Sequence, residues 1–114
     1  MEIEKHTLLG VLDEFITTFE KKVKKGFRSP ETLKHWRTSK DKVKCFIKFK
    51  TGNDDILLQD IKYRFAEDYF DYMTLEVERP LQERTANGEI KRIKQILRMC
   101  ARRDLINKII KGND

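Results

Sequence analysis

Cysteine is scarce in this sequence. Only two of its 114 residues are Cys, and neither Cys45 nor Cys100 stands in a C-x-x-C or Cys/His spacing. A disulfide scaffold or a zinc site in so short a chain needs more such residues at closer spacing. Both cysteines lie in stretches with apolar periodicity, so we expect reduced thiols in the core. The acidic loop at 53–55 also lacks the carboxylate spacing of a calcium loop. We therefore expect no metal site and no cofactor.

Long hydrophobic runs are missing as well. No apolar stretch approaches the roughly 20 residues that a helix needs to cross a bilayer. The first ten residues, MEIEKHTLLG, open with acidic side chains and lack the basic start of a signal peptide. These two absences favour a soluble, cytoplasmic protein.

Alternation of apolar and polar residues, the pattern of a half-buried strand, is not found over any useful length. Helical spacing predicts four helices instead, at 7–26, 29–50, 62–77 and 83–103, and a short fifth helix at 104–110. Thr7 and Ser29 are expected N-caps, Pro30 suits a first helical position, and Gly26 suits a helix end. The sequence therefore predicts an all-α fold, a four-helix bundle with room for a fifth helix, in a single domain over 1–114.

One face of each predicted helix is apolar and is expected to form the core. These faces consist of Leu8, Leu12, Phe15, Phe19 and Val23; Leu33, Trp36, Val43, Phe46 and Ile47; Phe65, Tyr69, Tyr72 and Met73; and Ala86, Ile90, Ile93, Leu97, Cys100 and Ala101.

Charge is distributed in blocks along the chain. Residues 21–50 carry twelve Lys and Arg against two acids, and 85–114 carry eight against three. The other two blocks, 1–20 and 51–84, are acidic, and the net charge of the chain is +6. A basic surplus concentrated in two segments suggests a polyanionic partner.

The predicted helix at 83–103 carries a stripe of long polar donors. At 100° per residue, the side chains of Arg84, Asn87, Lys94, Gln95, Arg98 and Arg102 fall within about 60° of Lys91, opposite the apolar face. Glu89, the one carboxylate in the body of the helix, points elsewhere. An ordinary solvated helix mixes charges of both signs and forms i,i+4 pairs, so this stripe is unusual.

The predicted helix at 29–50 repeats the pattern less cleanly. A broad outward face, interrupted by Asp41, carries Lys34, Arg37, Thr38, Lys44 and Lys48.

Three interpretations of these faces compete. The first is that both faces are simply solvated. The second is a membrane-surface helix, but such a helix would need the apolar face that the core already uses. Lys and Arg interspersed with Asn, Gln and Thr are the side chains that bind phosphates and base edges. The polar faces hold few aromatics, which argues against a platform for single strands. Duplex DNA is therefore favoured, and the candidate DNA-binding residues are Lys34, Arg37, Thr38, Lys44, Lys48, Thr85, Asn87, Lys91, Lys94, Gln95, Arg98 and Arg102.

Several motifs, in this order and spacing, resemble the SAM-like core-binding domain of tyrosine recombinases, the phage-integrase family. The resemblance is greatest to integrases of conjugative transposons and related mobile elements, and it covers about 7–107. The matching residues are Thr32, Leu33 and Trp36; Phe46–Lys48; Ile61, Phe65 and Tyr69; and Thr85, Ala86, Lys94, Ile96 or Leu97, Ala101, Leu105 and Ile106. The sequence departs from the family pattern at Gly88, where a longer side chain is usual, and at its INKIIKGND end.

The resemblance implies a SAM-like orthogonal bundle that forms one half of a C-shaped clamp around the recombination core site. Its second and fourth helices would lie at the major groove, and neighbouring protomers of a synaptic tetramer would be its protein partners. The location would be the bacterial cytoplasm, at the nucleoid when bound, with no membrane or small-molecule substrate.

The family's nucleophilic Tyr and its Arg, His and Lys partners belong to a separate catalytic domain, so this chain is not expected to be an enzyme. The residues leave one alternative open: a helical protein–protein interaction module with solvated basic faces and no DNA role.

Overall fold

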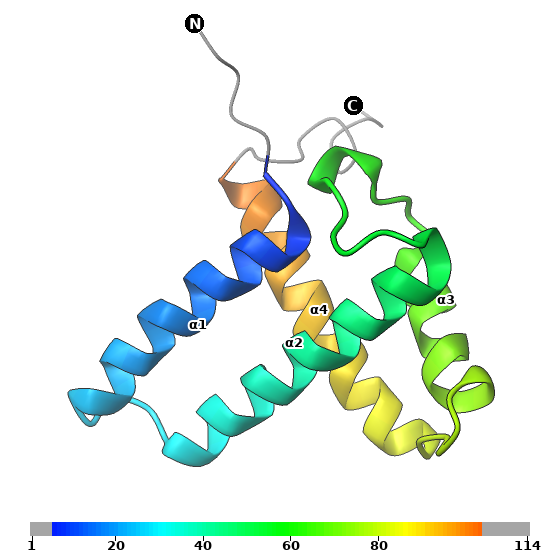
Figure 1. The fold of residues 1–114 in the computed structure, drawn as a ribbon. Coiled ribbons are helices and arrows are strands. Elements are labelled where there is room, and N and C mark those ends of the chain that lie inside the picture. Colours follow the sequence, from blue (N-terminus) through cyan, green and yellow to red (C-terminus); the bar gives the residue numbers. More distant parts are fainter. Residues whose placement is uncertain (1–5, 104–114) are drawn as a thin grey trace, which may run out of the picture. The chain divides into compact units, whose positions relative to one another are not determined.

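The computed structural model describes residues 6–103, and there the chain is helical. It contains α1 (Leu8–Lys24), α2 (Pro30–Thr51), α3 (Phe65–Asp71) and α4 (Glu83–Arg102), with a 3-10 turn η1 at Leu58–Asp60 and a π-helical segment η2 at Tyr72–Glu76 (Figure 1). Within 6–103 the extended pairing is limited to one isolated bridge, between Thr7 and Leu57. The all-α prediction is confirmed, and the helix predicted at 104–110 lies outside the described residues.

The chain divides into two compact units, with the boundary between Leu57 and Leu58. The first contains α1 and α2, and the second contains η1, α3, η2 and α4. The single domain expected from the sequence stays a prediction.

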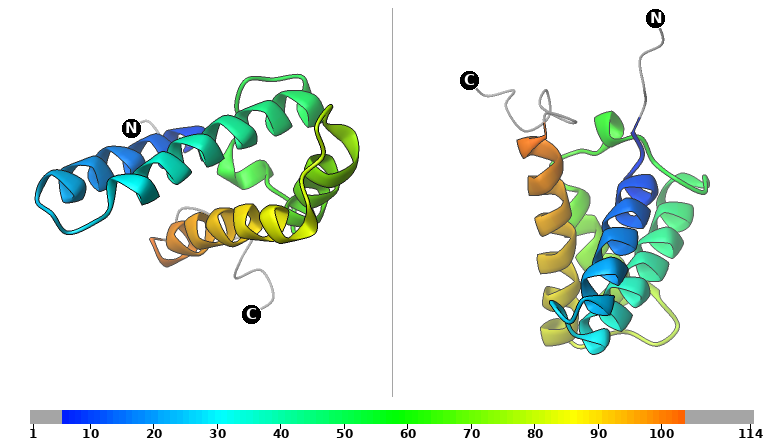
Figure 2. Two further views of the ribbon diagram at one scale, coloured as in Figure 1. Left: turned by 90° about the horizontal axis from the view of Figure 1, so that it is seen from below. Right: turned by 90° about the vertical axis from the view of Figure 1, so that its left-hand side faces the viewer.

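In the first unit, α1 and α2 pack against each other as an antiparallel hairpin (Figures 1 and 2). The start of α1 shows why the helix begins at Leu8. The Leu8 N–H donates to the Ile56 carbonyl (2.9 Å), and the Leu9 N–H donates to Asp55 Oδ1 (3.1 Å). Gly10 N–H donates to the hydroxyl of Thr7, the predicted N-cap (3.1 Å). The donors that a helix start usually leaves unpaired are therefore satisfied, two of them by the 55–56 loop.

We expect Asp55→Ala to lower the free energy of unfolding by about 1–2 kcal/mol, because it removes a cap and leaves the Leu9 N–H, which is partly buried, without its acceptor. Asp54→Ala is the matched control, since its side chain is 88% exposed and among residues 6–103 pairs only with the Lys48 ammonium, at 3.6 Å. Urea unfolding followed by circular dichroism measures both variants, and an equal effect of the two would contradict the capping role of Asp55.

The turn between α1 and α2 is closed by backbone hydrogen bonds. Gly26 N–H donates to the Val23 carbonyl (3.0 Å) and Phe27 N–H to the Lys22 carbonyl (2.9 Å), the two bonds of a Schellman motif. Gly26 has a φ of 79°, which other residues adopt only with strain. Ser29 then caps α2 through its hydroxyl, which accepts from the Glu31 N–H (3.0 Å), so both predicted boundaries are confirmed.

In the second unit, α3 is shorter than the helix predicted at 62–77. The α-helical hydrogen bonding ends at Asp71, and the chain continues as a π-helical turn that the Val77 N–H closes on the Tyr72 carbonyl (3.2 Å). The Thr74 hydroxyl donates to the Phe70 carbonyl four residues earlier (2.9 Å), a bond that competes with the helical ladder. Apolar periodicity cannot distinguish this local widening from a regular helix.

Most of the predicted core is buried. The exceptions are Phe15, Val23, Tyr72, Ile90, Leu97 and Ala101, which are half-buried. The prediction that both cysteines are core thiols is right for Cys100 and wrong for Cys45, which is exposed. At 100° per residue Cys45 falls about 180° from the buried Trp36, so the packing of Val43 and Phe46 turns it toward solvent.

Gly88 lies inside α4, where a Cβ would meet nothing within 4 Å. We expect Gly88→Ala to raise the free energy of unfolding by about 0.5–1 kcal/mol, because alanine loses less backbone entropy in a helix. Gly10→Ala is the contrasting variant in α1, where a Cβ would lie 2.9 Å from the capping Thr7 Oγ1 and should destabilise the helix start. Thermal unfolding of the two variants tests this opposition of sign.

Candidate nucleic-acid interface

The predicted stripe on α4 is present as an exposed surface. All seven candidate residues of this helix are exposed, and none of them forms an ion pair with another residue in 6–103. We call this set the α4 stripe: Thr85, Asn87, Lys91, Lys94, Gln95, Arg98 and Arg102. Four of its members are cations whose charge is not neutralised by any described carboxylate.

The opposite side of α4 is buried, and it is centred differently from the prediction. The buried residues are Ala86, Glu89, Ile93, Ile96 and Cys100. They fall at about 140–220° from Lys91, directly opposite the stripe, whereas the predicted apolar face was centred further round the helix. Burial of Glu89 was not foreseen. Its carboxylate is 7% exposed and lies 3.2 Å from the Arg92 guanidinium, which compensates its charge. The lone acid in the body of α4 is thus withdrawn from the stripe.

The candidate residues of α2 are exposed too, but their charges are partly neutralised. Arg37 pairs with Glu20 of α1, and Lys48 lies 3.6 Å from Asp54. Lys34, Thr38 and Lys44 have no such partner among the described residues. The α2 face and the α4 stripe belong to different units, so the structure groups the candidate residues within each helix and not between the two.

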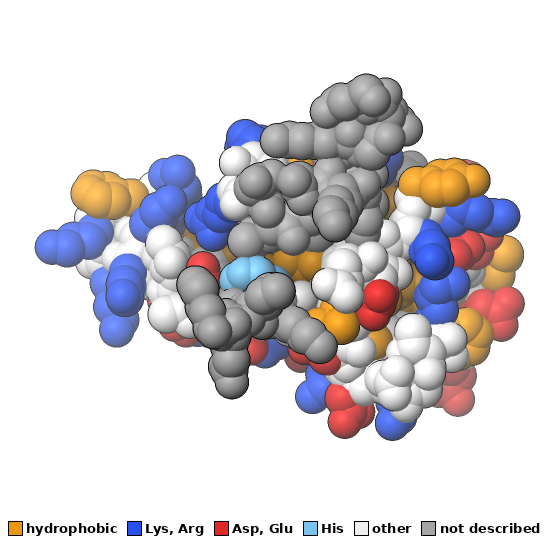
Figure 3. Space-filling model, turned by 90° about the horizontal axis from the view of Figure 1, so that it is seen from above, with side chains coloured by type: hydrophobic (Ala, Val, Ile, Leu, Met, Phe, Trp, Pro, Cys, Tyr) orange, Lys and Arg blue, Asp and Glu red, His pale blue; other side chains and the backbone are white. Residues whose placement is uncertain are grey.

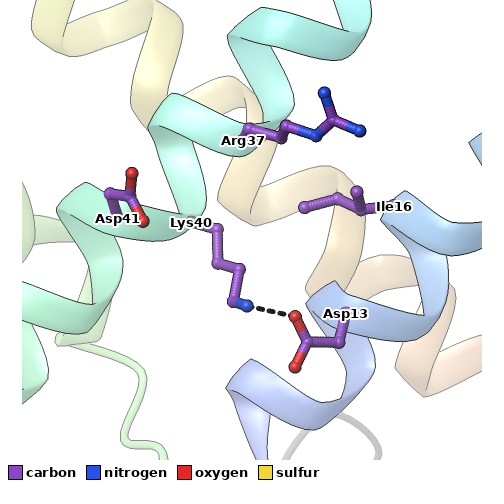
Figure 4. A pocket seen from close by; sticks show the side chains of 5 residues that line it. All are labelled: Asp13, Ile16, Arg37, Lys40 and Asp41. Carbon is purple, nitrogen blue, oxygen red and sulfur yellow. Dashed lines mark ion pairs between the residues drawn. The ribbon is translucent and has the colours of Figure 1, made fainter. Parts of the chain in front are cut away.

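A shallow hollow of about 300 Å³ lies between α1 and α2, lined by Asp13, Ile16, Arg37, Lys40 and Asp41 (Figure 4). Lys40 reaches across it and pairs with Asp13. Two cations and two carboxylates leave the lining without net charge, so the hollow is better explained as an ion-paired seam of the hairpin than as an anion site.

Comparison with known proteins identifies the family. The model of the phage integrase SAM-like domain matches residues 7–112, which is nearly the whole chain. The chain belongs to this family. No curated protein and no solved structure shows a significant match to it. Membership confirms the resemblance found in the sequence and supports a role in the DNA interaction of integrases and recombinases. No helix within 6–103 of this SAM-like domain is long and apolar enough to cross a membrane.

Three aromatic side chains of the SAM-like domain are exposed, and sequence reasoning missed them. Tyr63, expected at the core or rim of the third helix, is 91% exposed. Phe27, in the α1–α2 turn, is 67% exposed, and Phe49, on α2 between two lysines, is 58% exposed. Phe49 falls about 220° from Trp36 on a helical projection, so the projection could have placed it outside the core. Phe27 follows the helix stop Gly26, where helical periodicity carries no information.

Proposed function

We propose that this SAM-like domain binds double-stranded DNA as the core-binding domain of a site-specific tyrosine recombinase, with α4 at the major groove. The α4 stripe carries the proposal: one face of a 20-residue helix presents cations and amides, and the single carboxylate in the helix body is buried on the other face. Family membership supports it independently.

The dimensions of α4 suit a groove. A helix with its side chains is about 10–12 Å across, and the major groove is about 12 Å wide and admits one helix. From Lys91 to Arg102 the stripe extends about 16 Å along the helix axis, at about 1.5 Å per residue. Lys91, Lys94 and Arg98 would neutralise phosphates, and Gln95 and Asn87 have the amide groups that pair with base edges. Because no described acid neutralises these cations, binding breaks no ion pair at this surface.

The α2 face makes the smaller contribution in this proposal. Lys34, Thr38 and Lys44 are available as they stand, whereas Arg37 and Lys48 would exchange a carboxylate for a phosphate. The binding free energy gained by such an exchange is only the difference between two ion pairs, and an exposed ion pair contributes about 0–1 kcal/mol.

The proposal also includes the partners and the location of the domain. Its partners would be the recombination core site and neighbouring recombinase protomers in a synaptic tetramer, in the bacterial cytoplasm. The two units would act as one domain over 1–114, and we assign no catalytic step to this chain.

Fluorescence polarisation with a labelled duplex of random sequence at low salt tests this function. We expect saturable binding that weakens steeply as salt rises, because released counterions dominate phosphate binding. Undetectable binding at high micromolar protein would instead favour a protein–protein interaction module with solvated basic faces.

A further inference from the structure

The α1–α2 turn carries a concentration of positive charge that the duplex proposal does not use. Within eight residues it presents five exposed cations and one exposed aromatic ring, which we call the basic turn: Lys21, Lys22, Lys24, Lys25, Arg28 and Phe27. None of the five cations forms an ion pair with a described residue. Between 21 and 40 the sequence contains a single acid, Glu31. In Figure 3 the left end of the view, where this turn lies, shows Lys and Arg side chains beside a hydrophobic one.

Helix capping explains only part of this charge. Cations near a helix C-terminus offset a partial charge of about −0.5, so one lysine at the end of α1 would be enough. The remaining cations repel one another, at a cost to the folded state that no described contact returns. Capping of α1 therefore leaves most of these cations without a role in the fold.

Phe27 is not explained by folding either. It occupies the position after the helix-ending glycine, where a hydrophobic side chain normally packs back on the last turns of the helix. Here those positions are Lys21 and Lys22, and the ring stays 67% exposed. The backbone beneath it is fixed by the Schellman bonds, and Arg28 Nη1 donates to the Phe27 carbonyl (2.8 Å). The ring is thus presented to solvent on a turn that backbone hydrogen bonds hold in place.

We propose that the basic turn is a second nucleic-acid contact, which binds a DNA strand with unpaired bases. The cations follow the phosphates of that strand, and the Phe27 ring stacks on an exposed base. Cations that track one backbone, combined with an aromatic face, are the composition of single-strand binding surfaces. A paired base offers its face only after unstacking, so Phe27 should discriminate between unpaired and paired DNA. This contact stands beside the α4 stripe and shares no residue with it.

The test compares two DNAs of equal length that share one labelled strand with a run of thymines. In the perfect duplex the second strand is fully complementary, and in the interrupted duplex it carries thymines opposite that run, which stays unpaired. The wild-type chain should bind the interrupted duplex more tightly. Phe27→Ala should weaken that complex about 5- to 150-fold, the range of one base–aromatic stack, and change the affinity for the perfect duplex less than about twofold. Phe27→Trp should keep the preference. Replacing Lys24, Lys25 and Arg28 with Gln should lower the salt slope on unpaired DNA by about 0.7 for each phosphate that the variant no longer neutralises.

Equal binding of the interrupted duplex by wild type and Phe27→Ala would overturn the proposal, while binding of the perfect duplex would still support the α4 stripe. Conversely, suppose that the wild-type chain does not bind the perfect duplex and yet binds the interrupted duplex in a way that depends on Phe27. That result would overturn the α4 proposal alone. An anionic membrane is the alternative ligand of the basic turn. Sedimentation with phosphatidylcholine vesicles containing about a third phosphatidylserine tests for it. Vesicle binding that depends on Phe27, with unpaired-DNA binding that does not, would assign the basic turn to a membrane and overturn the proposal.

Discussion

Replacing Lys91, Lys94 and Arg98 together with alanine is expected to weaken duplex binding on the order of a hundredfold at low salt, from about 1 kcal/mol for each charged contact. The slope of log Kobs against log salt should fall by about 2–3, since each phosphate contact contributes about 0.9. The three side chains are exposed and unpaired with described acids, so their removal leaves the fold intact. Alanine also favours the helix.

Removal of three positive charges anywhere in the chain weakens binding somewhat, so the control must remove as many. Lys62, Arg64 and Arg79 lie in the second unit outside the candidate set, and of these only Arg64 lies near a described acid, Asp68, at 3.9 Å. Their triple alanine variant should change affinity by no more than about threefold. Polarisation titrations of both variants over a salt series decide between a specific stripe and general charge, and equal weakening by the two would contradict the assignment of α4.

Phe46→Ala is expected to lower the free energy of unfolding by about 3–5 kcal/mol, the usual cost of removing a buried phenyl group. Phe46 is 1% exposed on α2. Small domains have only about 5–15 kcal/mol of stability in total, so the variant should be close to unfolding at physiological temperature. Phe49→Ala is a control of the same residue type on the same helix, and since Phe49 is 58% exposed it should cost less than about 1 kcal/mol.

Trp36, the single tryptophan of the chain, is 4% exposed and reports on the first unit by fluorescence. Circular dichroism reports on all helices together. If 1–114 is one domain, as proposed, the two signals should change at the same urea concentration in wild type and in Phe46→Ala. Separate transitions would show that the units unfold independently, and a stability loss under about 1 kcal/mol would contradict the core position of Phe46.

The boundaries of the α1–α2 hairpin at Thr7, Gly26 and Ser29 could be predicted from the sequence because local chemistry determines them. Thr7, Ser29 and Gly26 act within a few residues of their own positions, and the structure places each where the sequence predicts it. The π-helical segment could not be predicted in this way. It contains the bond from the Thr74 hydroxyl to the Phe70 carbonyl, a local contact that apolar periodicity does not register.

The candidate site, too, could be predicted from the sequence only in part. Periodicity located the α4 stripe, because exposed positions on a regular helix follow from the buried ones. Burial of Glu89 against Arg92 could not be derived, since a carboxylate is normally assigned to solvent until its partner is seen. The pairing of Arg37 with Glu20 joins two helices and likewise required the folded hairpin. Phe27 was missed because its exposure depends on the turn and not on a helical face.

The central claim, that the α4 stripe contacts duplex DNA, is tested most directly by nuclear magnetic resonance of the 15N-labelled chain titrated with a random duplex. If α4 lies on the DNA, the amide resonances of Lys91, Lys94, Gln95 and Arg98 shift progressively and saturate, while those of Asp68 and Asp71 on acidic α3 stay in place. Saturable shifts confined to other elements, with α4 unchanged, would contradict it.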